Sequence, residues 1–257
     1  MRRIRCIIQY DGTNYVGWQV QPNGVSVQEK IEAALFKVVK EKVRIHGSGR
    51  TDSGVHARAQ VAHFDTEAKM PADKLAIALN GFLPPDIRIL YSEQAPDDFH
   101  ARFSAKKKQY RYTIQLGAHA DVFLRNTALH LHSVPDVALM DEAAKLCLGE
   151  HDFRSFMAVN TKMENTVREL YVSKWTQDGN LLHYDVEGNG FLYNMVRILV
   201  GTMLEIGRGR LPVSAMSAAL LAADRTNAGA TAPAHGLMLM RVCYPDFDTQ
   251  EVLGRVL

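Results

Sequence analysis

The sequence predicts an α+β protein made of two ferredoxin-like (RRM-like) halves, each an antiparallel sheet with helices on one face. Through residue 91 the hydrophobic periodicity gives the order strand, helix, strand, strand, helix, strand. A similar order begins again at residue 110, in a strand pattern that resembles residues 4–10. The break between the halves falls near Phe103–Lys106. We therefore expect an N-terminal domain over residues 1–104 and a C-terminal domain over residues 105–257.

The first half is predicted from alternation, capping and turn residues. Ser26 and Glu29 have the spacing of a capping box, so a helix begins after Ser26. Its buried face is expected to carry Ile31, Ala34, Leu35 and Val38. The other expected elements are strands over 2–10, 43–46, 59–64 and 87–91 and a helix from Pro71 to about Gly81.

The second half is predicted in the same way. A helix over about 190–206 is apolar nearly all round, which indicates that it is buried. A helix over 135–148 is expected to pack inward through Val137, Leu139, Met140, Ala143, Ala144 and Leu146. The remaining elements are strands over 110–117, 168–177, 180–187 and 236–242, a turn at Asp178-Gly179 and a helix over about 213–223.

Composition excludes several classes of protein. With 47% hydrophobic and 23% charged residues, the 257-residue chain has the make-up of a globular protein. No apolar run approaches the ~18 residues of a membrane helix, and the basic N-terminus leads directly into a strand, so we expect a cytoplasmic protein. The cysteines, Cys6, Cys147 and Cys243, form no C-x-x-C, and the histidines form no H-E-x-x-H. We expect neither a disulfide framework nor a metal site.

The net charge of +2 is too small to indicate a nucleic-acid-binding protein by itself. The distribution of the basic residues is more informative, because they cluster in three places. Each cluster fits either a phosphate-contacting surface or a solvated basic face. The clusters are Arg2, Arg3 and Arg5; Lys106, Lys107, Lys108 and Arg111; and Arg208 and Arg210.

The run Gly47-Ser-Gly-Arg-Thr-Asp-Ser-Gly-Val-His-Ala57, here called the signature loop, is the main functional candidate. Its three glycines allow tight turns and close approach of another molecule, and Arg50 and Asp52 point to one face if the chain is extended. On spacing alone, Asp52 is also a common turn residue. The run completes neither G-x-x-x-x-G-K-[ST] nor G-x-G-x-x-G, which argues against a nucleotide-phosphate loop.

This run, followed by Gln-Val-Ala-His-Phe over 60–64, resembles the signature of the TruA-type tRNA pseudouridine synthases. Residues 10–19, Tyr-Asp-Gly-Thr-Asn-Tyr-Val-Gly-Trp-Gln, resemble the opening motif of the same family, and Ala-Pro-Ala-His-Gly-Leu over 232–237 resembles its closing motif. The resemblance runs from about Tyr10 to Tyr244. It implies the pseudouridine synthase fold, with the catalytic loop in the N-terminal domain and a C-terminal domain that completes the active-site cleft.

By this resemblance Asp52 is the catalytic residue, and Arg50, Tyr110 and Arg197 bind the substrate. The family arginine matched by Arg50 enters the gap that the target base leaves, and Tyr110 contacts the target nucleotide. From the residues alone, Tyr110 fits a core strand aromatic as well as a stacking platform. Arg197 lies on the apolar helix and almost demands a carboxylate partner, which from the residues alone could form a purely structural ion pair. The resemblance identifies the partner as Asp52, whose pKa this contact would lower. Asn194 departs from the histidine often found at that position.

The implied reaction is the isomerisation of uridine to pseudouridine in tRNA. It detaches uracil at N1 and rejoins C5 to the same ribose carbon, so we expect no cofactor and no metal. Asp52 would act at C1′ or C6 on a base turned out of the RNA stack, and the sequence leaves the choice of atom open. The resemblance also implies tRNA positions 38, 39 and 40 in the anticodon stem-loop, and a homodimer.

Two other functions remain open on the residues. A non-catalytic tRNA-binding protein or chaperone would use the same basic surface without chemistry. A nucleotide-dependent enzyme would use the glycine-rich loop, although the absence of a P-loop lysine argues against it.

Overall fold

The computed structural model describes residues 1–159, 161 and 163–256, and the chain forms two compact units. The first unit contains Met1–Lys108 and the chain from Leu239 onward, and the second contains Gln109–Met238. The division falls inside strands β5 (Lys107–Leu116) and β10 (Leu237–Cys243).

The first unit is therefore discontinuous in sequence, which differs from the expected domain over 105–257. Helix α6 (Thr249–Val256) contacts β3 (His56–Thr66) and β4 (Ile87–Gln94). The guanidinium of Arg5 lies 3.2 Å from the carboxylate of Asp246. These contacts join the end of the chain to the first unit, and no local pattern in the sequence indicates such a return.

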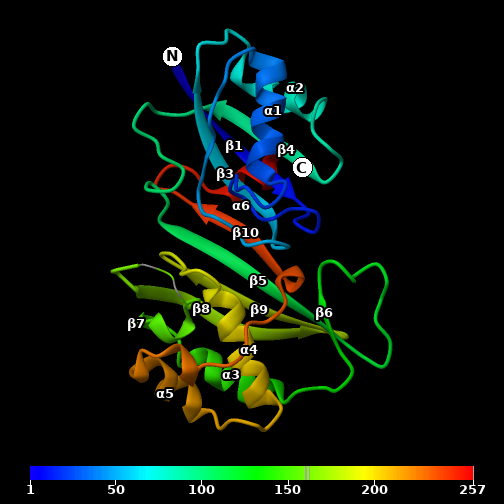
Figure 1. Ribbon diagram of the computed structural model, residues 1–257, viewed down its shortest axis with the longest axis vertical. Helices are drawn as coiled ribbons and strands as arrows, with labels where there is room; N and C mark the ends of the chain where they lie inside the picture. The colour runs from blue at the N-terminus through cyan, green and yellow to red at the C-terminus, as the bar shows by residue number, and fades with distance from the viewer. Residues whose placement is uncertain (160, 162, 257) are drawn as a thin grey trace. The chain divides into compact units, whose positions relative to one another are not determined.

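Strands of the first unit follow the ferredoxin-like order. Its sheet runs β4-β1-β3-β10, and the short strand β2 (His46–Gly47) pairs with β3. Strand β1 (Arg2–Tyr10) is antiparallel to both β3 and β4, as Figure 1 shows. The expected strand over 43–46 is reduced to β2, because only His46 and Gly47 have ladder partners on β3.

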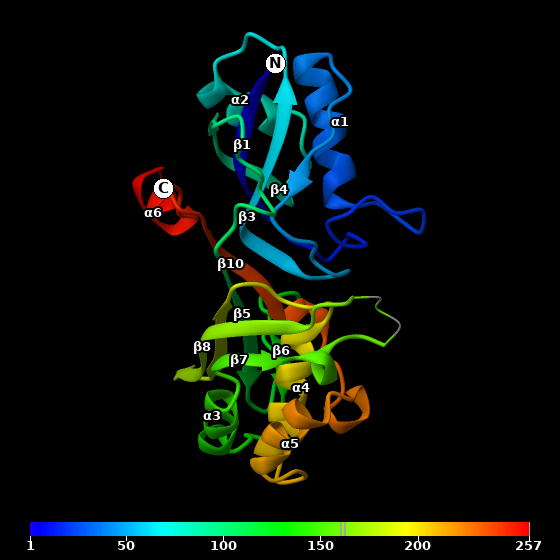
Figure 2. The same ribbon diagram turned by 90° about the vertical axis from the view of Figure 1, so that its left-hand side faces the viewer.

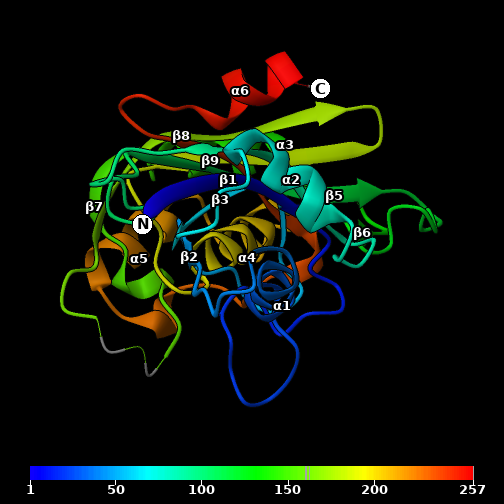
Figure 3. The same ribbon diagram turned by 90° about the horizontal axis from the view of Figure 1, so that it is seen from above.

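Helices of the first unit confirm the capping prediction. Helix α1 (Val27–Val39) begins with a capping box in which the Ser26 hydroxyl accepts from the Glu29 N–H at 3.2 Å. Its buried face includes Val39 rather than the expected Val38, which is half-buried. Helix α2 is Ala72–Asn80. Figures 2 and 3 show α6, which the sequence did not predict, on the side of the strands away from α1.

The sheet of the second unit runs β5-β9-β8-β7, with β9 at Leu181–Gly188, β8 at Val167–Asp178 and β7 at Gly149–Asp152. Strands β7, β8 and β9 pair antiparallel, as expected. Strand β6 (Leu129–Leu131) instead runs parallel to β5. This pairing differs from the expected antiparallel arrangement, and the three half-buried residues of β6 are too few to show a period.

Helix α4 (Met195–Gly207) is buried on nearly all sides, as its apolar sequence predicts. It lies against β8, since the Trp175 indole N–H donates to the Met203 sulfur at 3.2 Å. Helix α3 (Val137–Lys145) packs on α4, but its expected inward residues Leu139 and Leu146 are exposed. Helix α5 is Ser214–Ala222, and short 3₁₀ helices lie at Arg154–Phe156, Arg225–Asn227 and Ala234–Gly236. Across the described residues, every helix is too short or too polar to cross a membrane.

His63 on β3 is an ionisable side chain in the core of the first unit. It is 3% exposed, and its Nδ1 accepts from the Ala101 N–H at 3.1 Å. Burial, followed by the neighbouring His100, Arg3 and His46, lowers the pKa of His63 to about 4, against a smaller opposite effect of Asp65. The folded protein therefore holds this imidazole neutral at pH values where an unfolded chain protonates it.

We expect the free energy of unfolding to fall as the pH is lowered from about 6.5 to about 4. Over this range His63 becomes protonated in the unfolded chain but stays neutral in the folded protein. This difference lowers the free energy of unfolding by about 2 kcal/mol. Urea denaturation at a series of pH values measures the effect in the wild type and in His63→Asn, whose amide oxygen can accept from Ala101. Between pH 4 and pH 6.5 the free energy of unfolding should rise more steeply with pH for the wild type than for His63→Asn. Equal slopes for the two proteins would contradict the prediction.

Candidate active site

The first half of the signature loop is held to β3. The Ser48 N–H donates to the Val61 carbonyl at 2.7 Å, and the Ser48 hydroxyl donates to the Gln60 side-chain oxygen at 2.6 Å. The Gln60 side-chain amide in turn donates to the Gly49 carbonyl at 3.0 Å. Ser48 and Gln60 are both buried, so these bonds fix the loop where it leaves the sheet.

The aromatic segment over 10–18 supports the second half of the loop. The Trp18 N–H donates to the Thr51 carbonyl at 3.1 Å, and the Tyr10 and Thr51 hydroxyls share a hydrogen bond of 2.7 Å. Gly17 has φ +110°, and a Cβ there would lie 2.5 Å from the Thr51 oxygen. Only glycine allows this approach. The two motifs that resemble one family are thus packed together in the first unit.

The end of the loop is held by the same segment. A Cβ at Gly12 would lie 2.1 Å from the Val55 carbonyl oxygen, and the Gly12 N–H donates to Nδ1 of His56 at 3.0 Å. The Gly54 N–H donates to the Tyr15 carbonyl at 3.3 Å. Backbone contacts therefore fix the loop on both sides of Asp52.

Asp52 is half-buried at the start of a turn. The turn is closed through the main chain, because the Val55 N–H donates to the Asp52 carbonyl at 3.1 Å. Burial raises the pKa of Tyr10 to about 12, with a smaller contribution from the negative charge of Asp52, so this phenol stays protonated at neutral pH. Arg50, on the same loop, is exposed to solvent. The structure thus places both predicted residues of the loop on the first unit.

Lys108 is a residue of this loop's surroundings that the sequence interpretation missed. Its ammonium donates to the Ser48 carbonyl at 2.5 Å, so it supports the loop instead of serving only as a surface charge. The sequence does show three consecutive lysines, Lys106 to Lys108, but nothing in this run distinguishes Lys108, which contacts the loop, from the other two.

The other basic clusters are mostly engaged in ion pairs within the fold. Arg3 binds Asp65 through two bonds of 2.8 Å, and Arg111 binds the buried Asp185 at 2.8 and 2.9 Å. Arg5 lies 2.6 Å from Glu93 and over the Phe247 ring at 4.0 Å. Arg208 and Arg210 both bind Glu205. These five arginines are thus paired with carboxylates of the fold, and contact with phosphate stays a prediction for them.

Tyr110 belongs to the second unit, where its side chain is 7% exposed. Its ring meets the Phe191 ring edge-on, with 5.1 Å between centroids. This environment is typical of a packed aromatic pair. A role on the substrate therefore stays a prediction for Tyr110.

Arg197, also in the second unit, is held in a defined position. Its Nε donates to the Ala232 carbonyl at 2.7 Å, and its Nη1 donates to the Asn194 amide oxygen at 3.0 Å. Asn194 adopts φ +62° at the start of α4, a conformation that asparagine tolerates. Asn194, where the resemblance led us to expect a histidine, thus orients the arginine. Pairing of Arg197 with Asp52 joins residues of different units and stays a prediction.

Within the described residues, no group of three or more histidine, cysteine, aspartate or glutamate side chains could hold a metal ion. The three cysteines are unbridged, and burial raises the pKa of Cys6 and of Cys147 to about 12. These two thiols are therefore protonated at neutral pH and are poor nucleophiles.

Comparison with known proteins gives one consistent result. A family model described as tRNA pseudouridine synthase matches residues 6–104 and 143–245, more than half of the chain. The tRNA pseudouridine synthase A of Ruminiclostridium cellulolyticum is 49% identical over 95% of this chain and 100% of its own length. The proteins of the same name from Bacillus pumilus and Bacillus subtilis are each 48% identical over 94% of this chain and 99% of their own length.

Proposed function

Since the chain belongs to the tRNA pseudouridine synthase family, we propose that it isomerises uridine to pseudouridine in tRNA. The observation that carries this proposal is the similarity over nearly the full length of both chains. The fixed loop geometry around Asp52 supports it, because a reacting group must be held in place by its surroundings.

The proposed reaction breaks the bond between uracil N1 and ribose C1′ and forms a bond from C5 to the same carbon. N1 gains a proton and C5 loses one, so no electrons are exchanged with a cofactor. We propose Asp52 as the nucleophile, acting at C1′ or C6. Its half-buried position supports a carboxylate that is partly shielded from water.

The substrate-binding roles of Arg50, Tyr110 and Arg197 are proposed from the family resemblance. Arg50 would occupy the space left by the flipped-out base, and its exposure on the loop supports contact with RNA. Tyr110 would pack on the extruded uracil. Arg197 would lower the pKa of Asp52 and keep it ionised.

Replacing Arg197 by Gln is expected to move the acid limb of the pH–rate profile to higher pH by about 1 unit, because loss of a nearby positive charge raises the pKa of a carboxyl. Rates of pseudouridine formation between pH 4 and 9 measure this shift. Arg208→Gln, which removes an equal charge from an arginine bound to Glu205, should leave the profile unmoved. Equal profiles for the wild type and Arg197→Gln would contradict the proposed role.

The target positions, subunit state and location are also proposed. The resemblance supports tRNA positions 38, 39 and 40, a homodimer and a cytoplasmic enzyme.

Wild-type protein should release tritium from tRNA labelled at uridine C5, and substituting the uridines at these three positions should abolish the release. Sedimentation of the protein alone tests the dimer. Absence of release from several unmodified tRNAs that the protein binds would favour tRNA binding without catalysis.

A further inference from the structure

Phe103 is an exposed aromatic residue of the first unit, in the connection between β4 and β5. Its side chain is 75% exposed, and the proposed reaction makes no use of it. A single exposed apolar side chain needs no explanation by itself. Two features set Phe103 apart: hydrogen bonds fix the backbone that carries it, and its ring lies at the end of a row of rings that begins beside the signature loop.

The backbone around Phe103 is fixed by an imidazole. Nδ1 of His100 accepts from the N–H groups of Arg102 and Phe103, at 3.1 and 3.3 Å. The Ser104 N–H donates to the His100 carbonyl at 2.9 Å, and the Ser104 hydroxyl accepts from the His100 N–H at 3.0 Å. Ala101, between them, is fully buried. The exposed ring is therefore carried by a backbone that is held on both sides of His100.

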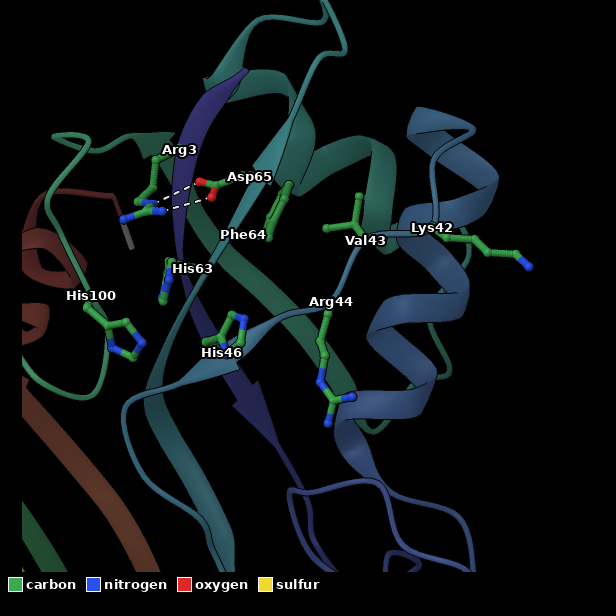
Figure 4. A pocket seen from close by; sticks show the side chains of 9 residues that line it. All are labelled: Arg3, Lys42, Val43, Arg44, His46, His63, Phe64, Asp65 and His100. Carbon is green, nitrogen blue, oxygen red and sulfur yellow. Dashed lines mark hydrogen bonds and ion pairs between the residues drawn. The ribbon is translucent and has the colours of Figure 1, made fainter.

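The row of rings connects Phe103 with the signature loop. His46, directly before the first residue of that loop, stacks on His63 with 5.1 Å between centroids. The centroids of His63 and His100 are 4.6 Å apart, and those of His100 and Phe103 are 4.3 Å apart. Figure 4 shows the three imidazoles side by side. Because His46 and His100 are only 5.8 Å apart, Phe103 lies two ring contacts from the start of the loop.

The main charges that act on the His100 ring are positive. Burial is the largest influence on its pKa and lowers it, and the charges of His46, Arg3 and Arg102 lower it further. A hydrogen bond of its own backbone has a smaller, opposite effect. The ring that supports Phe103 is therefore neutral at neutral pH and lies in positive surroundings.

Arg102 and Phe103 together present a cation beside an exposed ring. The Arg102 guanidinium carbon lies 5.7 Å from the centre of the Phe103 ring, and both side chains are exposed. Two carboxylates, Asp97 and Asp98, precede them in the chain. Over residues 95–108, however, three lysines and one arginine outnumber these two aspartates. The charge of the connection therefore favours an anionic partner.

The side chains around the ring favour RNA over protein. Proteins bind unpaired bases by stacking them on aromatic rings and on arginine planes, next to cations that attract the sugar-phosphate backbone. A protein partner needs a wider apolar surface than one ring, and Phe103 is flanked by Arg102 and Ser104. One fixed, exposed ring in positive surroundings thus has the chemistry of a base-stacking platform.

We propose that Phe103 is a stacking platform for an unpaired base of tRNA. The platform rests on the proposed function and adds a second base contact to that of Tyr110 with the target uracil. His100 supports the ring from below and fixes its backbone. Arg102 supplies the neighbouring positive charge.

Phe103→Ala should weaken the binding of unmodified tRNA about tenfold, the effect of losing one stacked base. The salt dependence of binding should keep its slope, because the lost ring carries no charge. Phe103→Trp keeps an aromatic face and should bind like the wild type, and circular dichroism checks that each variant is folded. Weak binding by a folded Phe103→Trp would contradict stacking.

Phe82→Ala is the matched control for this measurement. Phe82 is also a phenylalanine of the first unit, is 51% exposed, and has the Lys37 ammonium 5.5 Å from the centre of its ring. It does not belong to the row of rings that leads to the signature loop. Its replacement should therefore leave tRNA binding at the wild-type value.

Single abasic substitutions at the unpaired positions of the tRNA identify the stacked base. At one position, removal of the base should cost the wild type about tenfold in affinity and cost Phe103→Ala almost nothing, because that contact is already lost. Equal losses for both proteins at every position would overturn the proposal. So would a changed sedimentation of Phe103→Ala alone with unchanged tRNA binding, which would indicate a protein partner.

Binding needs no turnover, so the platform and the isomerase activity can fail separately. If the wild type binds tRNA through Phe103 but releases no tritium, the isomerase proposal fails and the platform stands. If the wild type releases tritium and Phe103→Ala binds tRNA as tightly as Phe82→Ala, the platform is overturned and the isomerase proposal stands.

Discussion

Replacing Asp52 by Asn is expected to lower tritium release from uridine-C5-labelled tRNA by at least about 10³-fold. The amide has nearly the shape of the carboxylate but lacks its charge, so it can neither attack the sugar or base nor stabilise positive charge on the ribose. The turn at Asp52 is closed by its main-chain carbonyl, and the flanking residues are fixed by backbone bonds. Binding of tRNA and the thermal midpoint should therefore remain close to the wild-type values.

Ser53→Ala is the matched control for this experiment. Ser53 is the next residue of the same loop, is exposed, and its hydroxyl donates to the Tyr15 carbonyl at 3.2 Å. Losing this partly exposed bond should cost at most about tenfold in rate. Wild-type release from a folded Asp52→Asn variant would show that Asp52 is a turn residue without a chemical role.

Gly201→Ala is expected to destabilise the second unit by about 3 kcal/mol. Gly201 lies in the middle of α4, and a Cβ there would be 1.7 Å from the carbonyl oxygen of Ala230 and 2.9 Å from its carbon. Both atoms are backbone, and the same loop is bound to Arg197 through Ala232, so it cannot move aside without losing that contact. Urea denaturation followed by circular dichroism measures the change.

Gly254→Ala, in α6, provides the comparison. A Cβ at Gly254 would meet no atom within 4 Å, so alanine should stabilise that helix by up to about 1 kcal/mol through its higher helix propensity. Replacing glycine by alanine is thus expected to lower the free energy of unfolding in α4 and to raise it in α6. A neutral or stabilising effect of Gly201→Ala would contradict the close contact between α4 and the backbone of Ala230.

The sequence predicted those elements whose signals are local. The capping box of α1 and the strand β1 depend on neighbouring residues, and both are confirmed, although β1 is buried on both faces from Ile4 to Ile8 and not on alternate residues. Helix α4 begins at Met195 and not near Gly190, because Asn194 adopts a left-handed conformation that composition does not reveal. Strands β6 and β7 have three and four residues, too few to show a period.

The surroundings of the candidate site were predictable only in part. The signature loop and the aromatic segment were each recognisable as motifs, but nothing local indicates that Thr51 packs against Gly17. The same holds for Lys108, which contacts Ser48 across 60 residues of chain, and for Arg111 with Asp185. These contacts between distant residues depend on strand register and on the path of the chain. Clusters of charged residues in a sequence specify neither.

The discontinuous first unit has a consequence for synthesis on the ribosome. Strand β3 has β10 as a neighbour, yet β10 is translated only after nearly the whole of the second unit. At ordinary elongation rates this leaves β3 without that neighbour for on the order of ten seconds. An open strand edge of this kind is a template for pairing with another nascent chain, so premature termination between the two parts would release an aggregation-prone fragment.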